Sequence, residues 1–280
     1  MSTAPLPPRR GRATTFMLLS YGLHAGALGL LVWQPAWWPW ALAIVALDHL
    51  AITAAGLWPR SRLLGPNWRR LPAAAAQGGQ VVISIDDGPD PKVTPQVLAL
   101  LDQYAVKASF FLIGTRAEQS PELVADIVSR GHSVENHSYS HPHLFSLFGP
   151  QRMAAEVARG QDCLTALSGQ RPRFFRAPAG LRNPFLEPVL ARHGLWLASW
   201  TRRGYDTRNA DADNVCARLL KGLAAGDILL LHDGHAARSA SGQPGILAVL
   251  PRVIEAISQA GLHCVTLPEA LLAARLAREA

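Results

Sequence analysis

The chain is poor in cysteine, and its few cysteines follow no known pattern. Cys163, Cys216 and Cys264 are the only ones in 280 residues, and no Cys-x-x-Cys pair occurs. A disulfide framework or a zinc finger needs paired or closely spaced cysteines, so neither is expected. The three thiols are expected to be free and mostly buried.

Acidic residues are almost absent from the first quarter of the chain. Residues 1–72 contain seven arginines and one acid, Asp48, a balance of +6, whereas the remainder has 20 basic and 19 acidic residues, a balance of +1. A nucleic-acid-binding chain would carry its basic excess on the main domain. Because this excess only flanks two apolar segments, no nucleic-acid partner is expected.

These two apolar segments, residues 16–33 and 41–58, are each 18 residues long. As helices they would measure about 27 Å, close to the hydrocarbon thickness of a bilayer. The uncharged connection, residues 34–40, contains three tryptophans, as interfacial turns do. No small-residue cleavage site follows the first segment, and the second comes at once, so a transmembrane hairpin over residues 16–58 is favoured over a cleaved signal peptide.

Arginines flank this predicted hairpin on both outer sides and are absent from its connection. The positive-inside rule therefore predicts that both ends of the hairpin, and everything after residue 59, lie on the cytoplasmic side of a bacterial inner membrane. Residues 1–15 are a basic tail, and residues 59–80 are interpreted as a juxtamembrane linker. The flanking arginines are Arg9, Arg10, Arg12, Arg60, Arg62, Arg69 and Arg70.

Three polar residues interrupt the apolar segments at similar predicted depth: His24, Asp48 and His49. A lone aspartate at mid-bilayer costs about 2.5–3.5 kcal/mol on insertion scales, so it is expected to face a partner. We predict that His24 approaches the Asp48–His49 pair. A location of these residues near interfacial water is the alternative.

From residue 81 onward, short apolar runs alternate with helical stretches. Strands are predicted at residues 81–85, 108–113, 133–136, 174–176, 195–200, 227–232 and 263–266. Helices are predicted at residues 95–104, 121–129, 151–167, 184–192, 212–224, 245–260 and 268–278. Because each return to a parallel strand needs a crossover, residues 81–280 are predicted to form one α/β domain with a parallel sheet. A closed or nearly closed (β/α)7 TIM-like barrel is the first choice, and an open doubly wound sheet is the second.

Distinctive polar residues follow the predicted strands at their C-terminal ends, where β/α barrels carry their chemistry. Two adjacent carboxylates raise each other's pKa unless a cation or an arginine lies beside them. Two histidines four residues apart, with one carboxylate, provide the three ligands of an open catalytic zinc site. Taken alone, each motif is also consistent with surface histidines, a structural ion pair or a core histidine. The residues are Asp86, Asp87, His137, His141, Arg176, Asp206 and His232.

Five motifs then occur in the order known from one family. Residues 84–89 (SIDDGP) resemble TFDDGP, residues 137–142 (HSYSHP) resemble H-S/T-x-x-H-P, and residues 176–180 (RAPAG) resemble R-x-P-x-G. Residues 205–206 (YD) resemble the fourth motif, and residues 230–232 (LLH) resemble L-x-H. Over about residues 80–272 the chain resembles the NodB-like polysaccharide deacetylases, carbohydrate esterase family 4. The resemblance implies a distorted (β/α)7 barrel, and it does not extend to the hairpin.

This resemblance assigns roles to the first three motifs. It implies that Asp87, His137 and His141 hold a divalent metal ion, usually zinc. It also implies that Asp86 is the general base and that Arg176 holds it in place and keeps it ionised. Both carboxylates can then stay charged side by side, because each has a cation next to it.

The remaining motifs supply the acid and the substrate contacts. The resemblance implies that His232 protonates the departing amine, that Asp206 orients His232, and that a backbone N–H near Ala179 helps the metal to hold the oxyanion. Leu231, in the fifth motif, is a further predicted substrate contact. Trp200 is expected to replace part of the acyl pocket wall.

The chain departs from the family pattern at two of these motifs. Ala179 stands where the family commonly has a tyrosine, and the fourth motif lacks its first acid and its tryptophan. These changes put the identity of the substrate in question more than the reaction, because the implied metal ligands, general base and general acid are all retained. Asp90 is expected to cap a turn. Five histidines match no catalytic position and are interpreted as structural or surface residues: His132, His143, His193, His235 and His263.

The sequence as a whole predicts a membrane-anchored, metal-dependent deacetylase of an amino sugar. A cytoplasm-facing domain would act on a lipid-linked glycan, whereas a domain on the other side would act on a polysaccharide. Two alternatives remain: a catalytically inactive, membrane-tethered carbohydrate-binding module, and a deformylase or O-deacetylase acting on a glycolipid.

Overall fold

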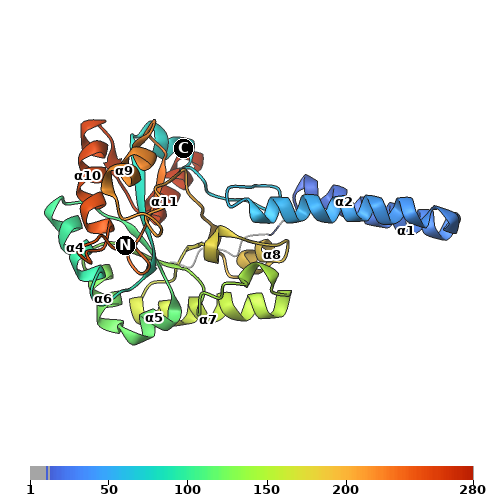
Figure 1. The fold of residues 1–280 in the computed structure, drawn as a ribbon, viewed down its shortest axis with the longest axis horizontal. Coiled ribbons are helices and arrows are strands. Elements are labelled where there is room, and N and C mark those ends of the chain that lie inside the picture. The colour runs from blue at the N-terminus through green and yellow to red at the C-terminus, as the bar shows by residue number, and fades with distance from the viewer. Residues whose placement is uncertain (1–10, 12, 280) are drawn as a thin grey trace.

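The computed structural model describes residue 11 and residues 13–279, so Arg9, Arg10 and Arg12 lie outside the described residues. Two parts are evident in Figure 1: an α/β domain, and a hairpin of two long helices that projects from it.

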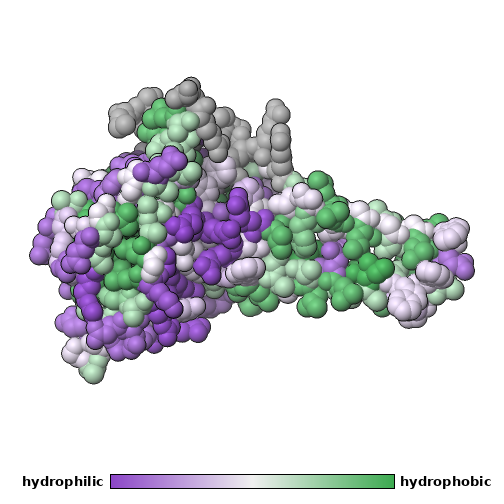
Figure 2. Space-filling view, turned by 90° about the horizontal axis from the view of Figure 1, so that it is seen from above, coloured by the Kyte–Doolittle hydropathy of each residue, from purple (hydrophilic) through white to green (hydrophobic). Residues whose placement is uncertain are grey.

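The hairpin consists of α1 (Thr15–Trp33) and α2 (Trp38–Leu57), joined by the short 3-10 helix η1 (Pro35–Trp37). Both helices are long and apolar enough to cross a membrane, and few of their side chains are buried. Hydrophobic residues dominate the face of the hairpin seen in Figure 2. The predicted segments match these helices closely. α2 begins slightly before residue 41, because Pro39 occupies its first turn, where a missing N–H does no harm.

The polar residues of the hairpin meet as predicted. Nδ1 of His24 lies 3.6 Å from Oδ2 of Asp48, and the His24 and His49 rings are 5.1 Å apart between centroids. The hydroxyl of Ser20 donates to the same Asp48 oxygen at 2.6 Å. Asp48 thus faces partners on α1, which removes the cost of an isolated carboxylate among apolar side chains.

Within the described residues, eight strands form one sheet at the centre of the domain, and all of their pairings are parallel. The spatial order is β5-β4-β3-β2-β1-β7-β6, and β8 pairs with the beginning of β1. The sheet curls into a distorted, incomplete barrel. The strands are β1 (Gln80–Gly88), β2 (Ser109–Leu112), β3 (Ser133–Asn136), β4 (Phe174–Phe175), β5 (Trp196–Leu197), β6 (Arg202–Arg203), β7 (Ile228–His232) and β8 (His263–Cys264).

Helices surround this sheet, and most of them follow a strand and return the chain to the next one (Figure 1). In chain order they are α3 (Ala73–Gln77), α4 (Thr94–Gln103), α5 (Gly114–Gln119), α6 (Pro121–Ser129), α7 (Pro150–Ser168), α8 (Leu186–Arg192), α9 (Ala212–Leu220), α10 (Ile246–Gln259) and α11 (Leu267–Glu279). Two further 3-10 turns are η2 (Phe145–Leu147) and η3 (Pro178–Gly180).

The predicted barrel is confirmed in its distorted form, and the doubly wound alternative is not. The sequence missed β6 because its two residues are both arginines and form no apolar run. It also missed α5, which follows β2 directly and precedes α6 by one residue. The strands expected at residues 195–200 and 263–266 are only two residues long.

Apolar side chains cover both faces of the sheet. Ile83 and Ile85 of β1 lie in the main core with side chains of the outer helices, such as Val97 of α4 and Val253 of α10. Val82, which points the other way, belongs to a separate cluster on the opposite face of the sheet. Side chains from residues 59–80 and α11 fill that cluster, so the linker is part of the fold.

Close packing joins the hairpin to the domain at the end of α2. A Cβ on Gly56 would lie 2.2 Å from the carbonyl oxygen of Arg182, and the N–H of Arg182 donates to the Gly56 carbonyl at 3.1 Å. Leu64 is buried against Met17 and Ala55 of the two hairpin helices. The hairpin is therefore docked on the domain through backbone and side-chain contacts.

Candidate active site

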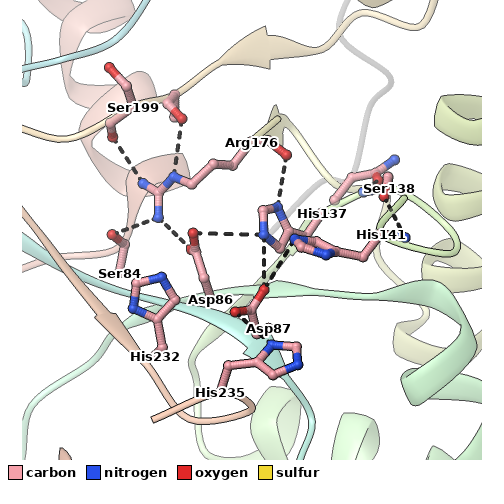
Figure 3. A network of polar contacts seen from close by, with 12 residues as sticks. Ser84, Asp86, Asp87, His137, Ser138, His141, Arg176, Ser199, His232 and His235 are labelled. Atoms are coloured by element: carbon pink, nitrogen blue, oxygen red, sulfur yellow. Dashed lines mark hydrogen bonds and ion pairs between the residues drawn. The ribbon is translucent and has the colours of Figure 1, made fainter. Parts of the chain in front are cut away.

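Polar side chains from separate strands meet at the C-terminal rim of the sheet (Figure 3). The parallel arrangement explains this, because the C-terminal ends of all the strands lie on one side. β1 supplies Asp86 and Asp87, and β7 supplies His232. His137 and Arg176 follow β3 and β4 directly.

Asp86 forms a buried ion pair with Arg176. Its Oδ1 lies 2.5 Å from Nη1 of the arginine, and both side chains are almost entirely buried. The same Nη1 donates to the hydroxyl of Ser84 at 2.9 Å. The rest of the guanidinium donates to the carbonyls of Ala198 and Ser199. With its donors held by fixed acceptors, Arg176 has one defined position, and so does Asp86.

Asp87, His137 and His141 form a second group beside this pair. Oδ1 of Asp87 lies 3.2 Å from Nε2 of His137 and 3.4 Å from Nε2 of His141. This carboxylate oxygen is buried without a hydrogen-bond partner among the described residues, an exception that calls for an explanation. One ligand atom from each side chain lies within 4.8 Å of the others. The three side chains can therefore hold a metal ion between them.

The backbone at this group is strained. Asp87 and His141 have φ values of +71° and +50°, in the left-handed region that non-glycine residues rarely adopt. Nδ1 of His137 bonds to the carbonyl of Arg176 at 2.8 Å, which directs Nε2 toward Asp87. Such strain is common at functional sites, where the surrounding structure enforces it.

Local charges set the protonation states of the group. Burial alone would raise the pKa of Asp87, but the imidazoles of His137 and His235 outweigh it and hold that pKa well below its usual range. Burial, with the neighbouring His137, lowers the pKa of His141 to about 4. Burial would lower the pKa of His137, but the charge of Asp86 and the hydrogen bond and charge of Asp87 raise it. Ionised carboxylates and neutral imidazoles are the forms that bind metals, so metal binding to this group would release the proton of His137.

His232 and Asp206 form a third pair. Nδ1 of His232 lies 2.9 Å from Oδ1 of Asp206, and the backbone N–H of His232 donates to Oδ2 at 2.7 Å. Burial would lower the pKa of His232, but the hydrogen bond and charge of Asp206, with the charges of Asp86 and Asp87, raise it above its ordinary value. The carboxylate fixes the ring and leaves Nε2 as the atom for proton transfer.

His235 was interpreted as a structural or surface residue, and it is exposed, but it also contacts the metal group. Its Nδ1 lies 3.0 Å from Oδ2 of Asp87, and its Nε2 accepts from Nη2 of Arg116 at 3.1 Å. Because Nε2 is the acceptor, Nδ1 carries the proton and donates to Asp87. Arg116 also donates to the Asp87 carbonyl at 2.6 Å. The only signal for this role in the sequence was that His235 follows His232 closely along the chain.

Asp233 is a second residue that the sequence did not single out. Its side chain is buried behind β1, where a Cβ on Gly88 would lie 2.7 Å from its Oδ1. The hydroxyl of Thr94 donates to its other oxygen at 2.6 Å. Burial, together with the charges of Asp87 and Asp90, raises the pKa of Asp233 to about 7. Asp90 itself caps the following turn as expected, since its Oδ1 accepts from the N–H groups of Lys92 and Val93.

The three predicted substrate contacts differ in their positions. Ala179 is exposed, with a φ of +55°, on the loop after Arg176. Trp200 is largely buried, and a Cβ on Gly180 would lie 2.7 Å from its ring. Leu231 does not line the site: its side chain has no exposed surface and packs in the main core. The sequence could not show this, because alternate residues of β7 point to opposite faces.

Comparison with known proteins agrees with this geometry. The profile of the polysaccharide deacetylase family matches residues 74–198. A peptidoglycan-N-acetylglucosamine deacetylase of Bacillus cereus is 32% identical over 195 residues, which cover 68% of this chain and 87% of the relative. The chain belongs to the polysaccharide deacetylase family. It is a hydrolase of the deacetylase type, which acts on carbon–nitrogen bonds.

Other relatives of this deacetylase support the assignment. A chitooligosaccharide deacetylase of a Bradyrhizobium strain is 32% identical over 196 residues, covering 68% of this chain and 89% of the relative. The solved structure of a peptidoglycan N-acetylglucosamine deacetylase superposes with a TM-score of 0.66 at 28% identity, covering 73% of this chain and 92% of that one. Deacetylases of this family are generally metal-dependent, in keeping with the group formed by Asp87, His137 and His141.

Removal of the His235 imidazole should weaken metal binding without removing a ligand. We expect His235→Ala to raise the dissociation constant for Zn2+ about 10- to 100-fold, the usual cost of losing a hydrogen bond to a metal ligand. Competition with a chromogenic chelator on the purified full chain measures this without any turnover. The control is His263→Ala, at an exposed residue of β8, which should bind as the unchanged protein does. Equal affinity in the two variants would show that His235 does not position Asp87.

Proposed function

We propose that this protein is a membrane-anchored, metal-dependent deacetylase that hydrolyses the N-acetyl group of an amino sugar. The observation that carries the proposal is that one group of three side chains and two pairs of side chains meet at the C-terminal rim of the sheet. These are the Asp87–His137–His141 group, the Asp86–Arg176 pair and the His232–Asp206 pair. Relatives named as deacetylases of N-acetylglucosamine and of chitooligosaccharides support the substrate class.

A divalent metal ion fits the first group. The orphaned oxygen of Asp87 and the Nε2 atoms of His137 and His141 point toward a common centre. One carboxylate and two imidazoles leave open positions for water and substrate, and this donor set suits zinc. When bound, the ion acts as a Lewis acid that polarises the acetyl carbonyl and lowers the pKa of water.

Asp86 is the general base in this proposal. Its Oδ1 is held by Arg176, and its Oδ2 lies 3.9 Å from Nε2 of His137, so the free oxygen faces the metal group. It takes the proton from the attacking water as the oxygen of that water bonds to the acetyl carbon. The positive charge of Arg176 lies directly beside Asp86 and offsets the repulsion from the neighbouring carboxylate of Asp87.

His232 is the general acid. Asp206 stabilises the imidazolium and orients Nε2, which gives its proton to the nitrogen as the carbon–nitrogen bond breaks. The products are acetate and a free amine. The backbone N–H of Ala179 is assigned to the developing oxyanion, as a donor fixed in advance by the loop conformation.

The hairpin supports a membrane location. It presents apolar side chains outward along both helices, and Trp33, Trp37, Trp38 and Trp40 are all exposed around its tip. Tryptophans at one level are typical of a membrane interface. The charge bias of the flanking arginines in the sequence supports a cytoplasmic orientation of the domain, so the proposed substrate is a lipid-linked amino sugar.

Loss of the base or the acid should abolish turnover and leave metal binding intact. We expect Asp86→Asn and His232→Ala each to lower kcat about 100- to 10,000-fold on an N-acetylated glycolipid while the zinc content stays unchanged, because neither residue is assigned as a ligand. Amine release and metal analysis of the same samples give both values. Asp87→Ala, which removes a ligand, should lose both properties. An unchanged protein that binds zinc and glycan but releases no amine would instead support the inactive binding module.

The pH profile should report the His232–Asp206 pair. Because Asp206 raises the pKa of His232, the acid is protonated and active below that raised pKa and is lost as pH rises through it. Asp206→Asn removes the negative charge, lowers the pKa and should move the alkaline limb of kcat/KM to lower pH. The control is Asp213→Asn, at an exposed carboxylate of α9, which should leave the limb in place. A limb that does not move in Asp206→Asn would assign the alkaline pKa to another group.

Reporter fusions should place the domain in the cytoplasm. Alkaline phosphatase joined at the C-terminus should be inactive, since it folds only outside the cytoplasm, and a fluorescent protein there should be bright. Fusions after residue 37, in the connection between α1 and α2, are the matched control and should give the opposite pair of signals. An active C-terminal phosphatase would place the domain outside the cytoplasm, with a polysaccharide as substrate.

A further inference from the structure

A basic cavity of about 410 Å³ lies beside the candidate active site, where the hairpin meets the domain. Its walls come from the chain just after α2, from residues 200–205 around β6, and from the end of α9. Five cationic side chains line it, and no acidic residue does. The five are Arg60, Arg202, Arg203, Arg218 and Lys221.

Most of this positive charge is uncompensated. Arg202 is neutralised by Asp227, whose Oδ2 lies 2.7 Å from its Nε. The other four cations form no ion pair with a carboxylate among the described residues. Self-repulsion of several unpaired cations in one cavity destabilises a fold unless an anion offsets it. The cavity therefore has the charge of an anion site.

Arg203 adds a second, independent observation. Its Nε is buried and has no hydrogen-bond partner in the part of the chain that the structure describes. Its guanidinium lies about 5 Å from the ring centroids of Trp200 and Tyr205, at 5.1 and 5.0 Å. The aromatic rings thus hold the arginine in place while a donor remains without an acceptor. Phosphate is one of the two anions, with carboxylate, whose geometry matches the arginine fork.

The position of the cavity connects it with both the reaction and the bilayer. Trp200, in its wall, packs on Gly180, the neighbour of Ala179 at the assigned oxyanion position. On the other side, Trp58 and Arg60 follow the last residue of α2 almost directly, and Trp58 is 57% exposed. With the hairpin in a membrane, the cavity lies at headgroup level, where aromatic and basic residues gather.

We infer that this cavity binds the phosphate or pyrophosphate group that joins an amino sugar to its membrane lipid. The inference rests on the proposed deacetylase function and names the substrate class: an anionic, phosphate-linked glycolipid. Arg203, Arg218, Lys221 and Arg60 hold the phosphate, the lipid chain runs back along the hairpin, and the sugar reaches the rim past Trp200. A larger cavity, of about 520 Å³, is also basic but lies between the linker and α11 and contains none of the rim residues.

Two synthetic substrates with the same alkyl chain test the inference with the full-length protein in phosphatidylcholine nanodiscs. One carries N-acetylglucosamine through a phosphodiester, and the other carries it through a neutral glycosidic bond. The unchanged protein should prefer the phosphodiester in kcat/KM. Arg218→Gln/Lys221→Gln should lower that preference about tenfold or more, mainly through KM, which corresponds to about 1.4 kcal/mol.

Both substituted residues are exposed, so folding should be retained, and unchanged zinc content checks it. Arg60→Gln, on the opposite wall, should lower the preference in the same direction. The matched control, Lys107→Gln/Arg252→Gln, removes two charges outside the cavity and should leave the preference as it was.

The outcomes separate the inference from the function on which it rests. If the unchanged protein deacetylates both lipids and the double variant keeps its preference, the anion site is wrong and the deacetylase stands. If it deacetylates neither lipid, the proposed function itself fails. Addition of phosphatidylglycerol tests the other source of phosphate. If the double variant loses kcat/KM equally on both substrates, and only in nanodiscs that contain phosphatidylglycerol, the cavity binds bulk anionic headgroups. This result would overturn the inference.

Discussion

Two adjacent carboxylates at the end of one buried strand are the constraint on which the site depends. Asp86 and Asp87 repel each other, and burial increases the cost of both charges. The fold separates them electrostatically: Arg176 neutralises one, and a group of imidazoles surrounds the other. Each partner comes from a different strand end, so the site exists only when the sheet is assembled. A misfolded chain would therefore not bring these charged side chains together.

The sequence predicted those parts of the molecule that are encoded by a local pattern. Asp86, Asp87, Arg176 and His232 follow apolar runs, His137 and His141 form a motif after the third predicted strand, and the order of the strands defined a parallel sheet. The sequence could not show contacts that depend on the closing of the barrel. The two-residue β6 exists because it pairs with β7, and no local pattern marks it. His235 reaches Asp87 only because the loop after β7 bends back across the rim.

The errors have a common physical origin. Leu231 was expected at the substrate and lies in the core, while Leu230 and His232 point to the other face of the same strand. A motif gives the spacing of residues but not the direction of each side chain. The same limit applies to the basic cavity, whose walls come from three segments that are remote in sequence. Arg60 and Lys221 line the same cavity only after the chain has folded.

The docking of the hairpin has a consequence for how the enzyme meets its substrate. Pro59 packs on Gly180, where a Cβ would lie 2.9 Å from it, so the loop after Arg176 rests on the base of the hairpin. If the hairpin spans a bilayer as proposed, these contacts would set the height of the rim above it. With the hairpin anchored as proposed, the search for the proposed glycolipid would take place in two dimensions, and the rate would depend on the surface density of the glycolipid, because anchoring replaces bulk concentration by a local one. A sugar that leaves the membrane would lose this advantage even if every contact at the metal group were kept.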